Sequence, residues 1–254
     1  MDGTRATGLG LFGQINKCLN KSKKTGVIKR SQDMLSSRSP TEVSNAKFMN
    51  PEQLLKSYAA GERVFRQANL RVADLSEVCL AGIKLGQADL ALANLSAANL
   101  RWSNLSEASL KGATLWRADL SGARLIRANL SGANLIQAKL SQADVHKAVL
   151  VRAELRLVDL RDADLSGADM TGVDLSYADL SNANLAGADL SRANLTGANL
   201  SNTDLYRVNL ARAILARTNL SAANLSEVNL DRVDLSTANL TDATLAELVS
   251  SNEN

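Results

Sequence analysis

Aspartate is the side chain in this sequence whose number and spacing could do chemistry. Asp164, Asp169, Asp174 and Asp179 recur at intervals of five residues, and carboxylates are ligands that calcium prefers. A metal site needs these ligands to converge, so the structure that a five-residue interval imposes decides whether they form one. The same question applies to every other polar side chain of the 254-residue chain.

Histidine and cysteine are too sparse to indicate a metal or redox centre. His146 directly follows Val145 and is expected at the surface as an ordinary residue, because a metal site needs further ligands around it. Cys79 stands directly before Leu80, where an outward turn residue is expected and redox sensing is the alternative. Two cysteines cannot form a disulfide framework, which indicates stabilisation by packing in a reducing compartment.

A period of five residues organises most of the chain. Every fifth residue from Leu70 to Leu245 is leucine except Val145 and Met170, so 34 of 36 positions are leucine. The residue two before each of these positions is small, alanine in 26 cases, and the residue directly before it is usually Asp or Asn. The unit is Ala-(Asp/Asn)-Leu-Ser-x, and repetition at a fixed period is typical of solenoids.

This period is neither that of a helix nor that of a strand, whose side chains repeat every 3.6 and 2 residues. A coil with four short sides, each one pentapeptide ending in a turn, places every Leu and the Ala two before it inside. Asp and Asn suit such turns through bonds to local backbone groups, and Gly after the Leu, as at Gly112 and Gly197, tolerates positive φ. Stacked coils form parallel ladders about 4.8 Å apart, so twenty residues per coil predict about nine coils and a rod roughly 43 Å long.

The segment from Phe65 to Leu245 resembles the pentapeptide-repeat proteins. Runs such as 163–167 and 193–197 match the consensus of that family residue by residue, and the match covers about 180 residues. The resemblance implies an all-β solenoid, a right-handed quadrilateral parallel β-helix. It implies little about activity, because the family serves mostly as a binding surface and a fold does not define a function.

Both ends of the repeat region are predicted to differ from the repeats. Asn50 as N-cap and Pro51 in the first turn predict a helix that covers the open first coil with Leu54, Leu55 and Tyr58, an opening similar to that of many cyanobacterial members. We expect a basic, disordered and flexible tail over 1–47, a short capping helix over 48–62, the β-helix over 63–247 and a C-terminal cap or tail over 248–254. A homodimer formed end to end through the C-terminal end, as in some relatives, is the alternative to a cap.

The predicted interior excludes most catalytic chemistry. Aromatic residues are 3% of the chain and hydrophobic residues 45%, so Leu and Ala must fill the rod. This leaves no pocket in which a nucleophile or general base could be desolvated, and we expect no enzyme activity, cofactor or metal site. The fivefold spacing also distributes the aspartates over four sides, where they are expected to make turns rather than bind calcium.

Large apolar and basic side chains at outward positions of the middle coils are unusual for a motif that prefers Ser and Gly there. An exposed patch often marks an interface, and Trp and Arg are favoured at binding hot spots. We predict a protein-binding band formed by Trp102, Trp116, Arg117, Arg124, Ile126, Arg127, Ile136, Lys147, Arg152, Arg156, Leu157 and Arg161. A separate column holds Arg152, Arg192, Arg212 and Arg232, for which a solvated row bridged to acids is the simpler interpretation.

The net charge of +3 conceals a basic first segment. Residues 1–60 carry ten basic and four acidic side chains, whereas the rest of the chain carries 19 basic and 22 acidic ones. A short apolar stripe near the start leads into a basic cluster that could contact an acidic partner or an anionic membrane surface. The residues predicted for this contact are Phe12, Ile15, Lys17, Lys21, Lys23 and Lys24. A segment without function and a cleaved targeting peptide are the alternatives.

These features favour a non-enzymatic scaffold or regulatory binding module in the cytoplasm, with a protein partner that the sequence does not identify. One alternative is a DNA-mimic modulator of DNA gyrase, because some members of the resembled family act in this way. Such mimicry requires a strongly acidic face, which a charge of −3 over residues 61–254 does not provide. The other alternative is an assembly or regulatory factor peripheral to a thylakoid or inner membrane, recruited through the tail. Nucleic-acid binding is disfavoured because the tail lacks interleaved aromatic residues.

Overall fold

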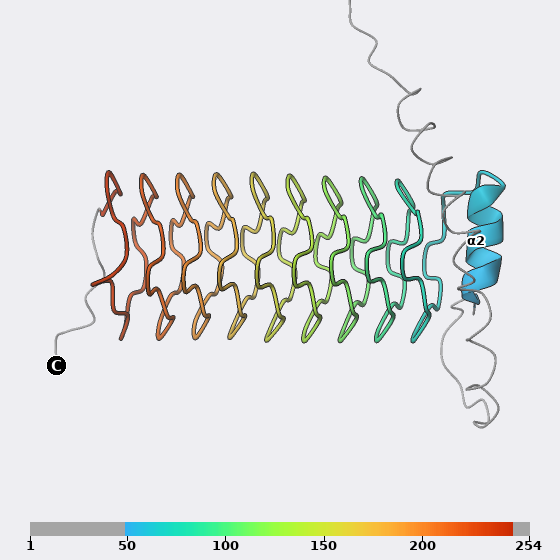
Figure 1. Cartoon of the computed structure of the whole chain (residues 1–254), viewed down its shortest axis with the longest axis horizontal. Helices are drawn as coiled ribbons and strands as arrows, with labels where there is room; N and C mark the ends of the chain where they lie inside the picture. The colour runs from blue at the N-terminus through green and yellow to red at the C-terminus, as the bar shows by residue number, and fades with distance from the viewer. Residues whose placement is uncertain (1–48, 246–254) are drawn as a thin grey trace, which may run out of the picture.

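The computed structural model describes residues 49–245 of the chain. Within them the regular elements are one helix, α2 (Pro51–Ala59), and a long series of parallel β-bridges. The helix lies at one end of a rod built from stacked coils (Figure 1). The predicted tail over 1–47 and the predicted end over 248–254 lie outside the described residues and stay predictions.

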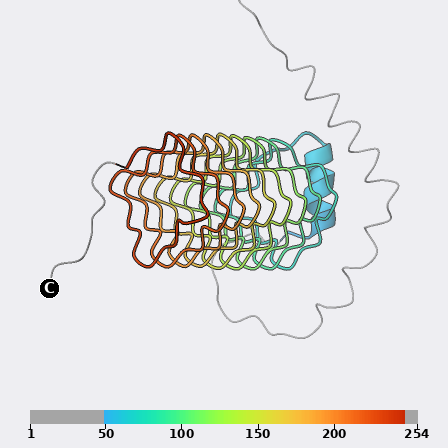
Figure 2. The same ribbon diagram turned by 60° about the vertical axis from the view of Figure 1, so that its left-hand side comes forward.

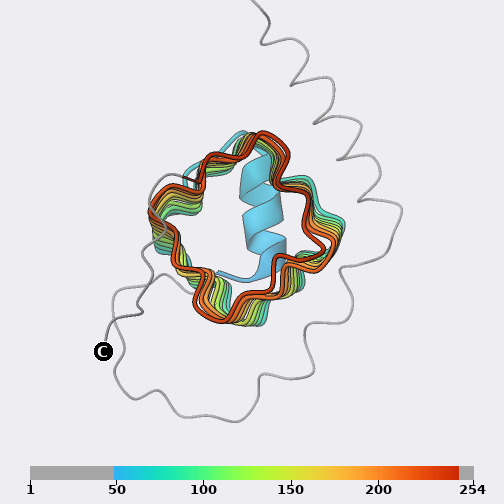
Figure 3. The same cartoon turned by 90° about the vertical axis from the view of Figure 1, so that its left-hand side faces the viewer.

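Each coil of the rod contains twenty residues. The β-bridges join residues twenty apart, from Val64 with Lys84 to Asn224 with Thr244, and all of them are parallel. Successive coils therefore lie directly over one another (Figure 2), and the end-on view shows a four-sided outline crossed by α2 (Figure 3). The four-sided coil expected from the five-residue period is present.

The four sides are numbered here by their inward residues. Side 1 contains Phe65 and every twentieth residue after it, and sides 2, 3 and 4 start in the same way from Leu70, Leu75 and Leu80. The two residues after each inward residue make the corner to the next side, so corner 3–4 follows side 3. Outward side chains at the same corner position of successive coils form a column along the rod.

The interior is filled as the sequence predicts. The inward Leu and the small residue two before it are buried from Leu70 to Leu225, in one continuous core. Val145 and Met170, which replace Leu, are also fully buried. Within residues 49–245, the small-residue position two before the inward residue also holds three buried hydroxyl side chains, those of Ser103, Thr203 and Thr218.

The corners require an unusual backbone at their second position. This residue has positive φ in nearly every coil, as Gly197 does at +67°. Residues other than glycine adopt the same conformation at most corners, including the β-branched Val72 at +61°. Positive φ costs an L-residue free energy, so the hydrogen bonds of the stacked coils must hold these corners in place.

Asp and Asn side chains close the turns and also tie the coils together. Asp74 Oδ1 accepts the Ser76 backbone N–H at 3.1 Å and the Ser76 hydroxyl at 2.8 Å. Asn94 Nδ2 of the following coil donates to the same oxygen at 3.1 Å. Because the pattern recurs along the rod, the aspartates act mainly in turns, as expected.

Helix α2 begins with the predicted cap. Asn50 Oδ1 accepts the Gln53 N–H at 2.7 Å, and the Gln53 side chain accepts the Asn50 N–H in return. Leu54 and Tyr58 of the helix are fully buried in the core. The Tyr58 hydroxyl donates to the Ala81 carbonyl at 2.8 Å, which connects the helix to corner 4–1 after the first coil.

The ladder is interrupted once near the C-terminal end of the described residues. On side 3 the pairs continue as far as Asn194 with Ile214, but Ile214 has no bridge to Asp234 within 49–245. The Arg217 N–H instead bonds Thr237 Oγ1 at 3.1 Å. The side therefore opens into a depression of about 290 Å³ between Arg212 and Arg232.

Candidate interaction surface

The residues of the predicted protein-binding band are exposed or half-buried, and the coil register distributes them around the rod. Side 1 and its corner carry Arg124, Ile126, Arg127 and Lys147; corner 2–3 carries Arg152; corner 3–4 carries Trp116, Arg117, Ile136, Arg156 and Leu157; corner 4–1 carries Trp102 and Arg161. The twelve residues therefore form two separate groups, with Arg152 and Arg161 apart from both.

The first group is the side 1 cluster, which we define as Trp102, Arg124, Ile126, Arg127 and Lys147. The Trp102 ring covers Gly122 of the next coil, and Arg124 follows that glycine by two residues. Arg124, Ile126 and Arg127 belong to one pentapeptide, and Lys147 occupies the column position after Arg127. The cluster thus combines an exposed indole with three neighbouring cations.

The cations of the side 1 cluster form no direct ion pairs in the described part of the chain. Within residues 49–245, no carboxylate lies within 4.0 Å of the charged atoms of Arg124, Arg127 or Lys147. His146, beside Lys147, is half-buried with its Nδ1 2.8 Å from the Ser166 hydroxyl, which is consistent with an ordinary residue. The three cations therefore form no direct ion pair with the described residues, although Asp144 follows Arg124 in the side 1 ladder and Glu107 precedes Arg127 in its column.

The second group is the corner 3–4 stripe, which we define as Trp116, Ile136, Leu157 and Tyr177. Trp116 and Ile136 occupy the first corner position of successive coils, and Leu157 and Tyr177 occupy the second position of the next two. Ile136 is half-buried and the other three are exposed. Arg117 stacks over the Trp116 ring at 4.5 Å from its centroid and donates to Gln137 Oε1 at 2.8 Å.

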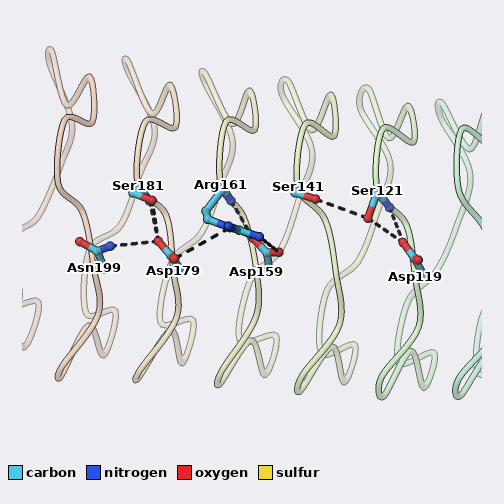
Figure 4. A network of polar contacts seen from close by, with 8 residues as sticks. All are labelled: Asp119, Ser121, Ser141, Asp159, Arg161, Asp179, Ser181 and Asn199. Carbon is cyan, nitrogen blue, oxygen red and sulfur yellow. Dashed lines mark hydrogen bonds and ion pairs between the residues drawn. The ribbon is translucent and has the colours of Figure 1, made fainter.

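Other arginines of the predicted band are occupied by ion pairs. Arg161 binds Asp159 through two hydrogen bonds of 2.9 Å and lies 3.9 Å from Asp179 (Figure 4). The Arg161 guanidinium lowers the pKa of the Asp159 carboxyl, and the carboxylate raises the pKa of Arg161. Arg156 lies 3.9 Å from Asp174. These contacts are local to the rod and surface-exposed, so each contributes little to stability.

The predicted arginine column at corner 2–3 is present but is not a bridged row. Arg152, Arg192, Arg212 and Arg232 are all exposed, with Gly172 interrupting the column. Within the described part of the chain, Arg232 alone among them has an acid at ion-pair distance, Asp231 at 3.9 Å. The bridging to acids expected from the sequence is therefore wrong for three of the four.

Large corner residues lie over glycines of the following coil, a relation that sequence reasoning missed. A Cβ added to Gly197 would lie 2.8 Å from the Tyr177 ring, and one added to Gly112 would lie 2.9 Å from Leu92 Cδ2. Trp102 covers Gly122 in the same way. The signal was available as a bulky residue followed twenty positions later by Gly, and it would have added Leu92 to the exposed apolar set, which from the outward positions alone already includes Tyr177.

Cys79 differs from its expected environment. It was expected as an outward turn residue, but it is only 3% exposed. Asn99, at the next position of the same column, donates to its Sγ at 3.5 Å and helps to cover it. Column stacking thus shields a position that the single pentapeptide leaves open, and the alternative of redox sensing loses the accessible thiol that it requires.

The described residues contain neither a cluster of metal-binding side chains nor a membrane-spanning helix. Among residues 49–245, no three His, Cys, Asp or Glu side chains gather as a metal site would require. In the same part of the chain, no helix has the length and hydropathy needed to cross a membrane. The residues predicted for the tail contact lie outside the described residues, so their role stays a prediction.

The fold and the exposed clusters define a β-solenoid whose distinctive chemistry lies on its outer surface. The chain belongs to the pentapeptide-repeat family, because the model for pentapeptide repeats matches eight copies within 73–112, 103–142, 138–176, 174–210 and 203–242. Members of this family form right-handed quadrilateral β-helices, and the coils described above have that four-sided form.

Solved structures similar to this chain include proteins from cyanobacteria and a plasmid-mediated resistance protein. HetL of Nostoc sp. strain PCC 7120, a protein involved in heterocyst differentiation regulation, is 35% identical over 78% of this chain and 99% of its own, with a TM-score of 0.28. The protein alr5209 of Nostoc is 41% identical over 41% of this chain and 80% of its own, with a TM-score of 0.26. QnrB1 in trypsin-treated form, a plasmid-mediated fluoroquinolone resistance protein, is 18% identical over 72% of this chain and 88% of its own, with a TM-score of 0.44. A comparison with curated proteins finds no match.

Proposed function

We propose that this protein is a non-enzymatic scaffold that binds an acidic surface of a partner protein through the side 1 cluster. The observation that carries the proposal is the group of three cations, Arg124, Arg127 and Lys147, without ion-pair partners in residues 49–245. A cation left in water beside Trp102 and Ile126 can pair with a carboxylate of a partner without losing an existing ion pair. Trp and Arg are enriched among residues that dominate binding free energy.

Rigidity supports a scaffold role. The cluster lies on three stacked coils whose backbone bonds connect it to the rest of the rod, such as Arg127 N–H to His146 O at 3.0 Å. Side chains on such a frame keep their spacing, which lowers the entropy lost on binding. We include in the proposal a stack of about nine coils and a capping role for α2, whose Leu54 and Tyr58 bury apolar surface of the first coil.

The proposal can be tested by affinity capture from soluble and membrane fractions of the native host. A variant with Arg124→Asn, Arg127→Asn and Lys147→Asn removes the charges, and Asn suits both the column position and the positive-φ corners. We expect this variant to lose a partner that the unchanged chain retains. The matched control removes the cations Arg192 and Arg212 by the same substitution at another corner and should retain the partner.

Two outcomes would contradict the assignment. Equal retention of the partner by both variants would place the interface elsewhere on the rod. Loss of the partner from a chain that begins at Ala46 would make the tail the recognition element and the rod a spacer. Circular dichroism of each variant checks that the coils remain folded.

The alternatives drawn from the sequence carry less support. A DNA-mimic modulator of gyrase needs a strongly acidic face, and the net charge of −3 over residues 61–254 does not provide one. No change in gyrase supercoiling on adding the protein would remove that alternative. A membrane-peripheral factor depends on residues 1–47, and deleting them should abolish flotation with anionic liposomes if that alternative holds.

A further inference from the structure

The corner 3–4 stripe has two chemically different ends. At the end near the N-terminus, Arg117 stacks on Trp116, and no carboxylate lies within ion-pair distance of it among residues 49–245. Asp119, further along the same coil, lies 3.9 Å from Arg101 instead. This end of the stripe therefore carries an uncompensated positive charge.

The other end of the stripe is acidic. Tyr177 lies between Asp174 on side 3 and Asp179 on side 4. The two carboxylates keep 36% and 41% of their side-chain surface exposed, and their arginine contacts are long, at 3.9 Å. In the middle of the stripe Arg156 lies beside Leu157 and follows Ile136 in its column, 3.9 Å from Asp174. A partner surface that fits the whole stripe must be acidic at one end and basic at the other, and between them it must pack against Ile136 and Leu157 beside Arg156.

The stripe itself has this composition when its direction is reversed. We propose that it binds a second copy of this chain, with the two rods side by side and antiparallel. Because each column keeps its own side of the interface, Arg117 of one copy then meets Tyr177 of the other next to Asp179. Ile136 meets Arg156 and Leu157 meets Gln137, so Ile136 and Leu157 are diagonal neighbours across the interface. Opposite charges and apolar contacts occur twice by symmetry, as an isologous interface requires.

The position of the stripe along the rod agrees with this arrangement. The two-fold axis falls between the coils of Ile136 and Leu157, and halfway along residues 63–245 is residue 154. Antiparallel rods joined about this axis overlap over almost their whole length. A stripe near either end would leave most of each rod without a partner.

The large side chains of the stripe change from the first to the second corner column halfway along it, which lets the side chains of two antiparallel copies pack between one another. Trp116 and Ile136 use the first corner position, whereas Leu157 and Tyr177 use the second. A two-fold axis that is perpendicular to both rods and lies in the interface places each column opposite the same column of the second copy. The Trp116 ring of one copy therefore lies next to the Tyr177 ring of the other rather than directly against it.

The side 1 cluster lies across the rod from corner 3–4 and stays uncovered in this dimer. The dimer proposal therefore does not depend on the proposed function.

The mass of the full chain in solution tests the association. The chain has a mass of 27.0 kDa, and light scattering or sedimentation should give twice this value at micromolar concentration. Leu157→Gly should raise the dissociation constant about tenfold or more. Leu92→Gly is the matched control, because Leu92 and Leu157 are each 53% exposed and have φ of 60° and 58°. It should leave the constant unchanged.

Cross-linking tests the antiparallel direction. Ser96 and Thr196 occupy the same column just beyond the two ends of the stripe, one hundred residues or roughly 24 Å apart in one chain, which no disulfide can span. In a Cys18→Ser background, mixing Ser96→Cys with Thr196→Cys should give a covalent 96–196 dimer, and neither variant alone should cross-link.

Three results would overturn the proposal. The mass of a single chain at every concentration would exclude the dimer. Equal weakening by Leu157→Gly and Leu92→Gly would place the interface elsewhere. Cross-links of Ser96→Cys with itself would make the rods parallel.

Discussion

The hydroxyl of Ser103 provides a direct test of how the interior is built. Ser103 is fully buried at a position where most coils have Ala, and its Oγ has no hydrogen-bond partner within residues 49–245. A buried polar group without a partner costs about 1–3 kcal/mol, whereas the dispersion contacts of one oxygen atom amount to a few tenths. Ser103→Ala should therefore raise the free energy of unfolding by about 1 kcal/mol, or roughly 2–4 °C in Tm for a chain of this length.

The same interior offers the opposite case as a control. Thr203 is equally buried, but its Oγ1 donates to the Leu200 carbonyl at 2.7 Å. Thr203→Val removes the hydroxyl, keeps the shape and should lower stability by about 1 kcal/mol. Thermal unfolding followed by circular dichroism measures both. A Ser103→Ala variant that melts at or below the unchanged chain would refute the reasoning.

Two further outcomes follow from corner packing and from pH. Gly122→Ala places a methyl group against the Trp102 ring, so the ring should move outward, tryptophan emission should shift to the red and stability should fall by about 1 kcal/mol or more. Gly132→Ala has the same positive φ but open space, and should leave the emission unchanged. Arg161 holds the pKa of Asp159 below its usual value. The stabilisation from this pair is therefore complete above about pH 4 and is lost as the pH falls through the lowered pKa. In a carboxyl NMR titration, Arg161→Ala should return that pKa toward its usual value; an unchanged pKa would contradict the assigned cause.

The sequence was sufficient to predict the fold because one local rule repeats without interruption. Leu at every fifth residue and a small residue two before it must both face the interior, and few backbone geometries allow this. The four-sided coil of twenty residues is one that does. The helix was predicted over 48–62 and is observed as Pro51–Ala59. Its presence was predictable because Asn50 and Pro51 are typical of a helix N-terminus.

The candidate surfaces were predictable only in part. The outward bulky residues could be selected from the sequence, but one band was expected where the structure has two groups. To group outward residues, one must know which of the four sides each residue is on and in which coil, and the position within the pentapeptide alone gives neither. The burial of Cys79 was missed for a related reason, since Asn99 covers it from twenty residues away. The break after Ile214 has no counterpart in the repeat pattern, which continues regularly through Leu235.

Because a coil contains four pentapeptides, the side of the rod on which a residue lies depends on the number of pentapeptides before it. Deleting one pentapeptide from the middle of the rod would move every later residue to the neighbouring side, turning the second half by a quarter of a revolution. Deleting twenty residues would instead shorten the rod by about 4.8 Å and preserve every column. Length and rotational phase can therefore change independently during evolution or engineering, so the spacing and relative direction of two binding surfaces can each be set in discrete steps.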